Sequence, residues 1–92
     1  MTRLMLIELL HEFGHHYWVT KGFEIPTEND HGKWRIREEI RAWGYAFACV
    51  NKKTRTRWMD EALRCVRSYD RQEHFTDRQI RKLILDDRKA VK

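Results

Sequence analysis

Hydrophobic side chains recur every three or four positions in four segments of the chain, which is the period of an amphipathic α-helix. The first segment covers residues 2–20, and its predicted core face consists of Leu6, Leu10, Phe13 and Tyr17. The second covers residues 33–50, where the apolar stripe is formed by Ile36, Ile40, Trp43, Phe47 and Val50. Each stripe predicts a helix that turns one face toward the core.

Two more helices are predicted in the second half of the chain. Residues 51–56 form a polar, basic break, and the apolar residues of the third segment are Trp58, Ala62, Val66 and Tyr69. Thr76 and Gln79 have the spacing of a capping box, in which two side chains bond each other's backbone N–H groups at a helix start. The terminal helix that follows has the apolar residues Ile80, Leu83, Ile84 and Val91.

The segment between the first two helices is rich in residues that favour turns, namely Gly22, Pro26, Asn29, Asp30 and Gly32. Only residues 22–26 look extended there. The chain shows no internal repeat, and its 92 residues fit one small domain. We therefore predict a mainly α, compact single domain over residues 1–92, with about four helices and little or no sheet.

Composition indicates the environment of the protein. Hydrophobic residues make up 41% of the chain, which is enough to fill a core. No apolar run approaches the roughly 20 residues of a membrane-spanning helix, and residues 13–18 do not resemble a signal-peptide cleavage site. We therefore expect a cytoplasmic protein with no membrane partner, whose cysteines, Cys49 and Cys65, are reduced and packed.

Charge is distributed unevenly along the chain. Residues 1–50 carry six basic and seven acidic side chains, whereas residues 51–92 carry 13 basic and seven acidic ones, and the net charge is +5. The basic half predicts either an ordinary solvated surface or contacts with nucleic acid or a nucleoprotein partner. The residues expected to make such contacts are Lys52, Lys53, Arg55 and Arg57. No recognised nucleic-acid-binding motif accompanies them.

The first predicted helix contains the pattern H-E-x-x-H, from His11 to His15. Residues four positions apart on a helix lie about 40° apart around its axis, so the two imidazoles can bind one metal ion. Glu12 lies beside them, where a carboxylate can accept a proton from a water at the metal. We therefore predict a Zn²⁺ site with Glu12 as the catalytic general base, while His16 is expected on the exposed surface.

A catalytic zinc usually has a third protein ligand, and the second predicted helix offers Glu38 and Glu39. Glu39 lies beside the apolar stripe, four residues before Trp43, so it would face whatever that stripe packs on. Glu39 is therefore the preferred ligand. Glu38 lies about 100° away and is expected either in solvent or holding the ring N–H of a ligating histidine.

The residues from His11 to His15, followed by the run Glu39-Ile-Arg-Ala-Trp-Gly-Tyr-Ala46, resemble gluzincin-type zinc metallopeptidases, and among them the ImmA/IrrE-like peptidases of phages and mobile elements. In that family, H-E-x-G-H precedes a helix reading roughly E-x-x-A-N-x-F-A, whose first Glu is the third zinc ligand. The resemblance implies that Glu39 is that ligand, that Ala42 lets the two helices approach, and that Tyr45 is the aromatic residue of the motif. Trp43 stands where the family has a polar residue.

Family members also carry a sheet before this helix, whose edge strand aligns an extended substrate. Residues 22–26 are the only counterpart in this chain. What the resemblance implies is a zinc-dependent metallopeptidase that hydrolyses a peptide bond in a protein partner. Such a reaction needs a group that stabilises the developing oxyanion, and the available residues are His31, Tyr69 and His74.

A second interpretation of the sequence is not enzymatic. It is a small phage-type regulator or inhibitor that binds nucleic acid or a nucleoprotein complex through residues 51–92. The motif by itself also leaves open a purely structural zinc, no zinc at all, or a chain that is one part of a larger peptidase.

Overall fold

The computed structural model describes residues 3–23 and 32–91, and these residues form four helices. The helices are α1 (Arg3–Thr20), α2 (Lys33–Ala48), α3 (Lys52–Tyr69) and α4 (Asp77–Ala90). The described ranges contain no strand, so the predicted mainly α architecture is confirmed. None of these helices is long and apolar enough to cross a bilayer.

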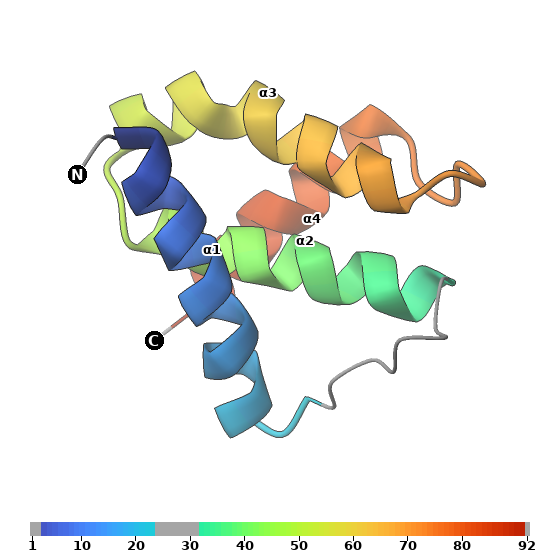
Figure 1. The fold of residues 1–92 in the computed structure, drawn as a ribbon, viewed down its shortest axis with the longest axis horizontal. Coiled ribbons are helices and arrows are strands. Elements are labelled where there is room, and N and C mark those ends of the chain that lie inside the picture. The colour runs from blue at the N-terminus through green and yellow to red at the C-terminus, as the bar shows by residue number, and fades with distance from the viewer. Residues whose placement is uncertain (1–2, 24–31, 92) are drawn as a thin grey trace.

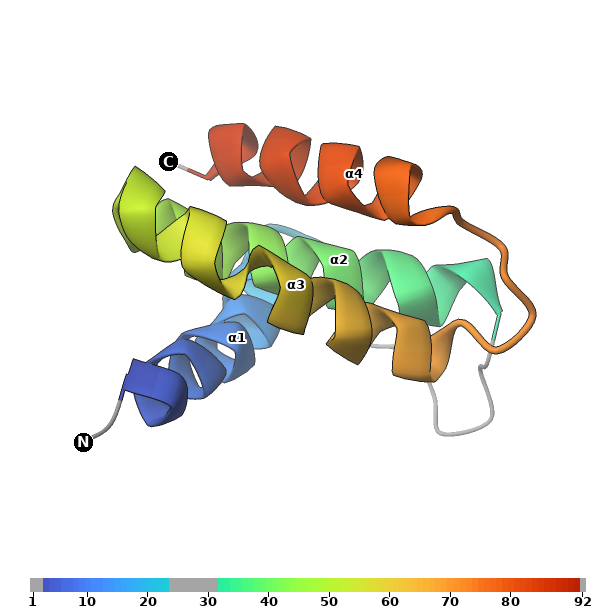
Figure 2. The same cartoon turned by 90° about the horizontal axis from the view of Figure 1, so that it is seen from above.

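Helix α2 lies at the centre of the arrangement and contacts the other three helices (Figure 1). Helix α1 crosses it on one side, and α3 and α4 pack on it and on each other. Figure 2 shows α1 and α4 on opposite sides of α2. Among the described residues, α1 packs mainly on α2, and its Ile7 also reaches the core that α2 shares with α3 and α4.

The core is built on α2, and its predicted apolar stripe is confirmed. Ile36, Ile40 and Phe47 are fully buried, Trp43 is nearly so, and Val50 is half-buried at the edge of the core. The core residues from α3 and α4 are Met59, Ala62, Leu63, Val66, Ile80 and Ile84. Full burial of a large aliphatic or aromatic side chain contributes about 1.5–3 kcal/mol, so these contacts dominate the stability of the domain.

Local capping determines where α3 and α4 begin. The Thr76 hydroxyl accepts from the Gln79 N–H and the Gln79 side chain accepts from the Thr76 N–H, which confirms the predicted capping box. The expected polar break at residues 51–56 was wrong, because the Asn51 side chain accepts from the Thr54 N–H and α3 begins at Lys52. An Asn at this position satisfies an N–H that would otherwise have no intrahelical partner.

Helix α1 buries a face shifted by one residue from the predicted one. Leu6 and Phe13 are 45% and 49% exposed. The residues of α1 that are buried are Ile7, His11, Gly14 and Trp18. A Cβ on Gly14 would lie only 2.4 Å from the backbone oxygen of Ala42, so α1 and α2 cross where Gly14 has no side chain. This close approach turns the histidines inward and Leu6 and Phe13 outward.

Further sequence predictions concern residues 22–26 and the two cysteines. Residues 24–31, which include most of the predicted extended piece at 22–26, lie outside the described residues. Both cysteines are free thiols; Cys65 is half-buried, whereas Cys49 is exposed and the expectation of a packed side chain there was wrong. Burial raises the pKa of the Cys65 thiol, which keeps it protonated at neutral pH.

Candidate metal centre

Two histidines of α1 face α2 from the buried side of the helix. His11 is buried and His15 is half-buried, and their ring centroids are 4.8 Å apart. Because they are four residues apart on one helix, both rings project on the same side. The crossing at Gly14 brings this side of α1 against the backbone of Ala42.

The carboxylate of Glu39 contacts both histidines from α2. His11 Nε2 lies 2.8 Å from Glu39 Oε2, and His15 Nε2 lies 3.4 Å from Glu39 Oε1. Glu39 is only 2% exposed, so its charge is held away from bulk water. A buried carboxylate is costly unless it is paired with a cation, a metal or hydrogen-bond donors, and the two imidazoles are the partners found here.

Glu38 contacts the other nitrogen of His15. Its Oε1 and the Nδ1 of His15 form a short hydrogen bond, and Glu38 is buried. Burial opposes protonation of His15, but the hydrogen bond to Glu38 and the charge of Glu39 outweigh it, so the pKa of His15 is raised above its ordinary value. In the protonated ring Nδ1–H faces Glu38 and Nε2–H faces Glu39, and the Nε2 proton is the one that a metal ion would replace.

Aromatic side chains of α2 pack against the same part of α1. Trp43 stacks on the His11 ring, with centroids 4.6 Å apart and planes 18° apart. Tyr45 packs on Tyr17 at 5.0 Å. The indole N–H of Trp18 donates to the backbone oxygen of Arg41 over 2.6 Å, which ties the end of α1 to α2. The orientation of the His11 ring is therefore restricted by its stacking on Trp43.

A hollow of about 270 Å³ opens beside the histidines. It is lined by Glu12, His15, His16, Val19, Arg35, Glu38, Glu39 and Tyr69. The Glu12 side chain is 69% exposed and its Oε1 lies 3.8 Å from His11 Nδ1. Glu12 is thus close to the histidine pair and open to water, as a proton acceptor must be.

Tyr69 and Arg35 form the opposite wall of this hollow. The Arg35 guanidinium lies over the Tyr69 ring, 5.3 Å from its centroid. The negative charge of Glu39 raises the pKa of Tyr69, and burial adds to the effect, so the hydroxyl keeps its proton at neutral pH. The sequence contained no signal for Arg35, which precedes Ile36 of the apolar stripe and shares the hollow with residues of α1 and α3 only in the folded chain.

The other residues considered for oxyanion stabilisation lie elsewhere. His31 is outside the described residues. The ring of His74 hydrogen-bonds Asp70 at 2.9 Å, and Asp70 also accepts the backbone N–H groups of His74 and Phe75. Burial alone would raise the pKa of Asp70, but these hydrogen bonds outweigh it and lower the pKa. His74 is therefore held by Asp70 at the end of α3 and does not line the hollow.

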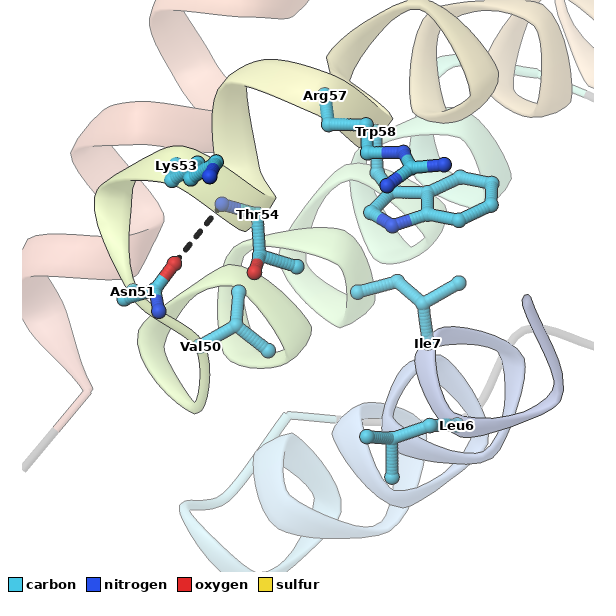
Figure 3. A pocket seen from close by; sticks show the side chains of 8 residues that line it. All are labelled: Leu6, Ile7, Val50, Asn51, Lys53, Thr54, Arg57 and Trp58. Carbon is cyan, nitrogen blue, oxygen red and sulfur yellow. Dashed lines mark hydrogen bonds between the residues drawn. The ribbon is translucent and has the colours of Figure 1, made fainter. Parts of the chain in front are cut away.

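The four basic residues predicted to contact a partner are divided between two sides of α3. Lys53 and Arg57 line a hollow of about 400 Å³ between α3 and the start of α1, together with Trp58 and Ile7 (Figure 3). Lys52 and Arg55 line a separate groove between α3 and α4. A single surface containing all four residues is therefore not formed.

Comparison of the chain with protein-family models, with characterised proteins and with solved structures finds no match. The donor atoms of the site therefore indicate what it could bind. Two groups offer ligand atoms within 4.8 Å of one another, namely His11, Glu12 and His15, and His15, Glu38 and Glu39. Imidazole and carboxylate are common zinc ligands, and ligands about 2.1 Å from a tetrahedral metal lie roughly 3.4 Å apart. The 3.4 Å separation of His15 Nε2 from Glu39 Oε1 fits that spacing, whereas the 2.8 Å contact of His11 Nε2 with Glu39 Oε2 is a direct hydrogen bond. Neither group contains the predicted ligands His11, His15 and Glu39 together, so a metal ion bound by all three would have to separate His11 from Glu39.

Proposed function

We propose that this protein is a zinc-dependent hydrolase that cleaves a peptide bond in a protein partner. The observation that carries the proposal is the contact of the buried Glu39 carboxylate with the Nε2 atoms of both His11 and His15. The open position of Glu12 beside them supports a hydrolytic rather than a purely structural site. The choice of a peptide bond rests on the resemblance of His11–His15 and Glu39 to the gluzincin-type peptidases.

Each residue has a separate role in this proposal. His11, His15 and Glu39 would hold the zinc ion, which supplies Lewis-acid chemistry that polarises a carbonyl and makes water more acidic. Glu12 accepts the proton of the attacking water and delivers it to the leaving amine. Glu38 holds the Nδ1 proton of His15, so that Nε2 remains a free donor atom for the metal.

Tyr69 is the residue that we assign to the developing oxyanion. Its hydroxyl is protonated at neutral pH, since Glu39 raises a pKa that is already well above 7, and it lines the same hollow as Glu12. A protonated phenol can donate a hydrogen bond to an oxygen that gains negative charge in the transition state. The Arg35 guanidinium adds positive charge beside the ring.

The first experiment is a measurement of metal content per chain. Protein purified without chelating resin is supplied with zinc, desalted and analysed by plasma mass spectrometry, and wild type is compared with His15→Ala and Glu39→Ala. About one zinc per chain is expected in wild type and a strong loss in both variants. Glu8→Ala removes an exposed carboxylate from the same helix and should leave the zinc content unchanged.

The second experiment separates a catalytic site from a structural one. Glu12→Gln should retain zinc but lose the ability to cleave a fluorescein-labelled protein substrate such as casein, because an amide cannot accept the proton. Tyr69→Phe should lower the rate of cleavage without changing the zinc content. A wild-type protein that binds no zinc would contradict the proposal, and cleavage that persists in Glu12→Gln would contradict the mechanism.

A further inference from the structure

A basic groove runs between α3 and α4, on the side of the molecule away from the histidines. It encloses about 570 Å³ and is lined by Lys52, Arg55, Thr56, Met59, Asp60, Arg81, Leu85, Arg88 and Lys89. Five of these nine residues are cationic and only Asp60 is acidic. Because α1 and α4 lie on opposite sides of α2, the groove is separate from the hollow beside Glu12 (Figure 2).

The five cations have no carboxylate partner within ion-pair distance among residues 3–23 and 32–91. The acidic residues next to Arg88 in the sequence are occupied elsewhere: Asp86 pairs with Lys82, and Asp87 accepts two bonds from Arg37. The buried Nε of Arg88 also has no hydrogen-bond partner in this part of the chain. Like charges gathered in one concave surface repel one another and concentrate anions from solution.

We propose that this groove binds the phosphate backbone of nucleic acid, without reading its sequence. Arg81 and Arg88 are two helical turns apart, or about 10.5 Å along one face of α4. Along the axis of a duplex each strand carries one phosphate per about 3.4 Å, so this face of α4 spans an axial length that holds roughly three phosphates per strand. Lys52 and Arg55 add charge from the facing helix.

The composition of the groove favours nucleic acid over an acidic protein as the ligand. Surfaces that bind proteins are depleted of charged residues at their centre, whereas surfaces that bind nucleic acid are strongly positive. Three of the five cations are arginines, whose planar guanidinium groups form paired hydrogen bonds with phosphate oxygens. The groove adds Arg81, Arg88 and Lys89 to the sequence prediction and leaves Lys53 and Arg57 outside it.

The test is binding of a short fluorescent DNA duplex, measured by anisotropy over a range of salt concentrations. If each cation neutralises one phosphate, the slope of log K against log salt is about −4.5 for the wild type. Lys52→Gln with Arg81→Gln removes one exposed cation from each helix. This double variant should bind at least tenfold more weakly near 0.1 M salt, with a slope close to −2.7.

The matched control is Arg71→Gln with Arg78→Gln, which has the same net charge but changes exposed cations outside the groove. It should retain wild-type affinity and slope, and circular dichroism establishes that both double variants are folded. Equal weakening by the two double variants would overturn the proposal in favour of diffuse charge. Absence of wild-type binding at low salt would also overturn it.

Two further measurements identify the kind of ligand that the groove binds. Poly-glutamate of matched charge should compete poorly with the duplex, and stronger competition by poly-glutamate would show that the groove selects acidic protein instead. A second duplex of unrelated sequence should bind equally well, since no base-reading element lines the groove. Binding should be unchanged in His15→Ala, because the proposal does not depend on the metal site.

Discussion

Replacing Gly14 by alanine should disturb both the packing of α1 on α2 and the geometry of the histidine pair. An added Cβ would lie 2.4 Å from the Ala42 oxygen and 2.8 Å from its Cα, and both of these are backbone atoms. Ordinary contacts of a Cβ begin near 3.4 Å, so the two helices must separate by about 1 Å. This separation of α1 from α2 would draw Glu39 away from His11 and His15.

The size of the expected loss of stability depends on which atoms the added Cβ meets. Overpacking a core by one methyl group costs about 1–3 kcal/mol, and the upper end applies because backbone cannot move aside as a side chain can. Alanine is about 1 kcal/mol more favourable than glycine within a helix. The expected net loss is therefore about 2 kcal/mol, which lowers the melting temperature of a domain of this size by roughly 8–16 °C.

Two assays separate the effects on stability and on the site. Urea unfolding without metal measures the loss of stability, and competition with a chromophoric chelator measures zinc affinity in the folded protein. Gly44→Ala is the matched control, because its Cβ would meet Asp87 Cβ at 2.6 Å, at the contact of α2 with α4. Gly44→Ala should lose stability but keep zinc affinity, whereas Gly14→Ala should lose at least tenfold in zinc affinity as well, because ligand distances tolerate only about 0.2 Å.

A Gly14→Ala protein as stable as the wild type would contradict the close crossing of α1 over α2 at Gly14. If the variant were unstable but bound zinc as tightly as Gly44→Ala does, the crossing would be correct and its link to the metal centre wrong.

Three further predictions concern single interactions. Asp70→Asn should destabilise the protein by about 1.5–3 kcal/mol at neutral pH, because a charged acceptor of two backbone N–H groups and the His74 ring is lost. Because the pKa of Asp70 is lower in the folded protein, its contribution to the free energy of unfolding is present above the unfolded-state pKa near 3.8 and disappears as pH falls below that value. Chemical denaturation from pH 7 to 2.5 should show this loss of stability in the wild type and a smaller loss in Asp70→Asn. Glu38→Gln should weaken zinc binding by about 10–100-fold in chelator competition, because His15 loses the carboxylate that orients it. Unchanged zinc affinity would assign Glu38 a role in folding alone. Trp43→Phe should keep zinc affinity within a few-fold of the wild type, whereas Trp43→Leu should lower it, because only an aromatic ring can stack on His11. Equal zinc affinities of the two variants in the same assay would show that stacking on His11 does not contribute to zinc binding.

Much of the fold could be predicted because the residues that specify a helix lie close together in the sequence. The stripe from Ile36 to Phe47 and the capping box at Thr76 involve residues within a few positions of one another, and both were confirmed. The H-E-x-x-H spacing has the same local origin, since it brings His11 and His15 to one side of α1. The contact of Glu39 with both rings agrees with its place beside the stripe of α2.

Other features depend on contacts between residues that are far apart in the chain. Helix α1 is apolar around most of its surface, so its hydrophobic pattern could not identify which side is buried, and the crossing of Gly14 over Ala42 decided it. Tyr69 was one of three equivalent candidates until the packing of α3 brought it to the hollow beside Glu12. The basic groove likewise exists only because α4 lies beside α3.

The sequence by itself therefore determined the helices and the histidine pair, because each follows from a period of 3.6 residues within one segment. Only the tertiary structure decided which faces meet and which distant side chains share a hollow or a groove. The physical reason is that close packing of helices is selected by shape, here by a glycine without a Cβ, and not by hydrophobicity alone.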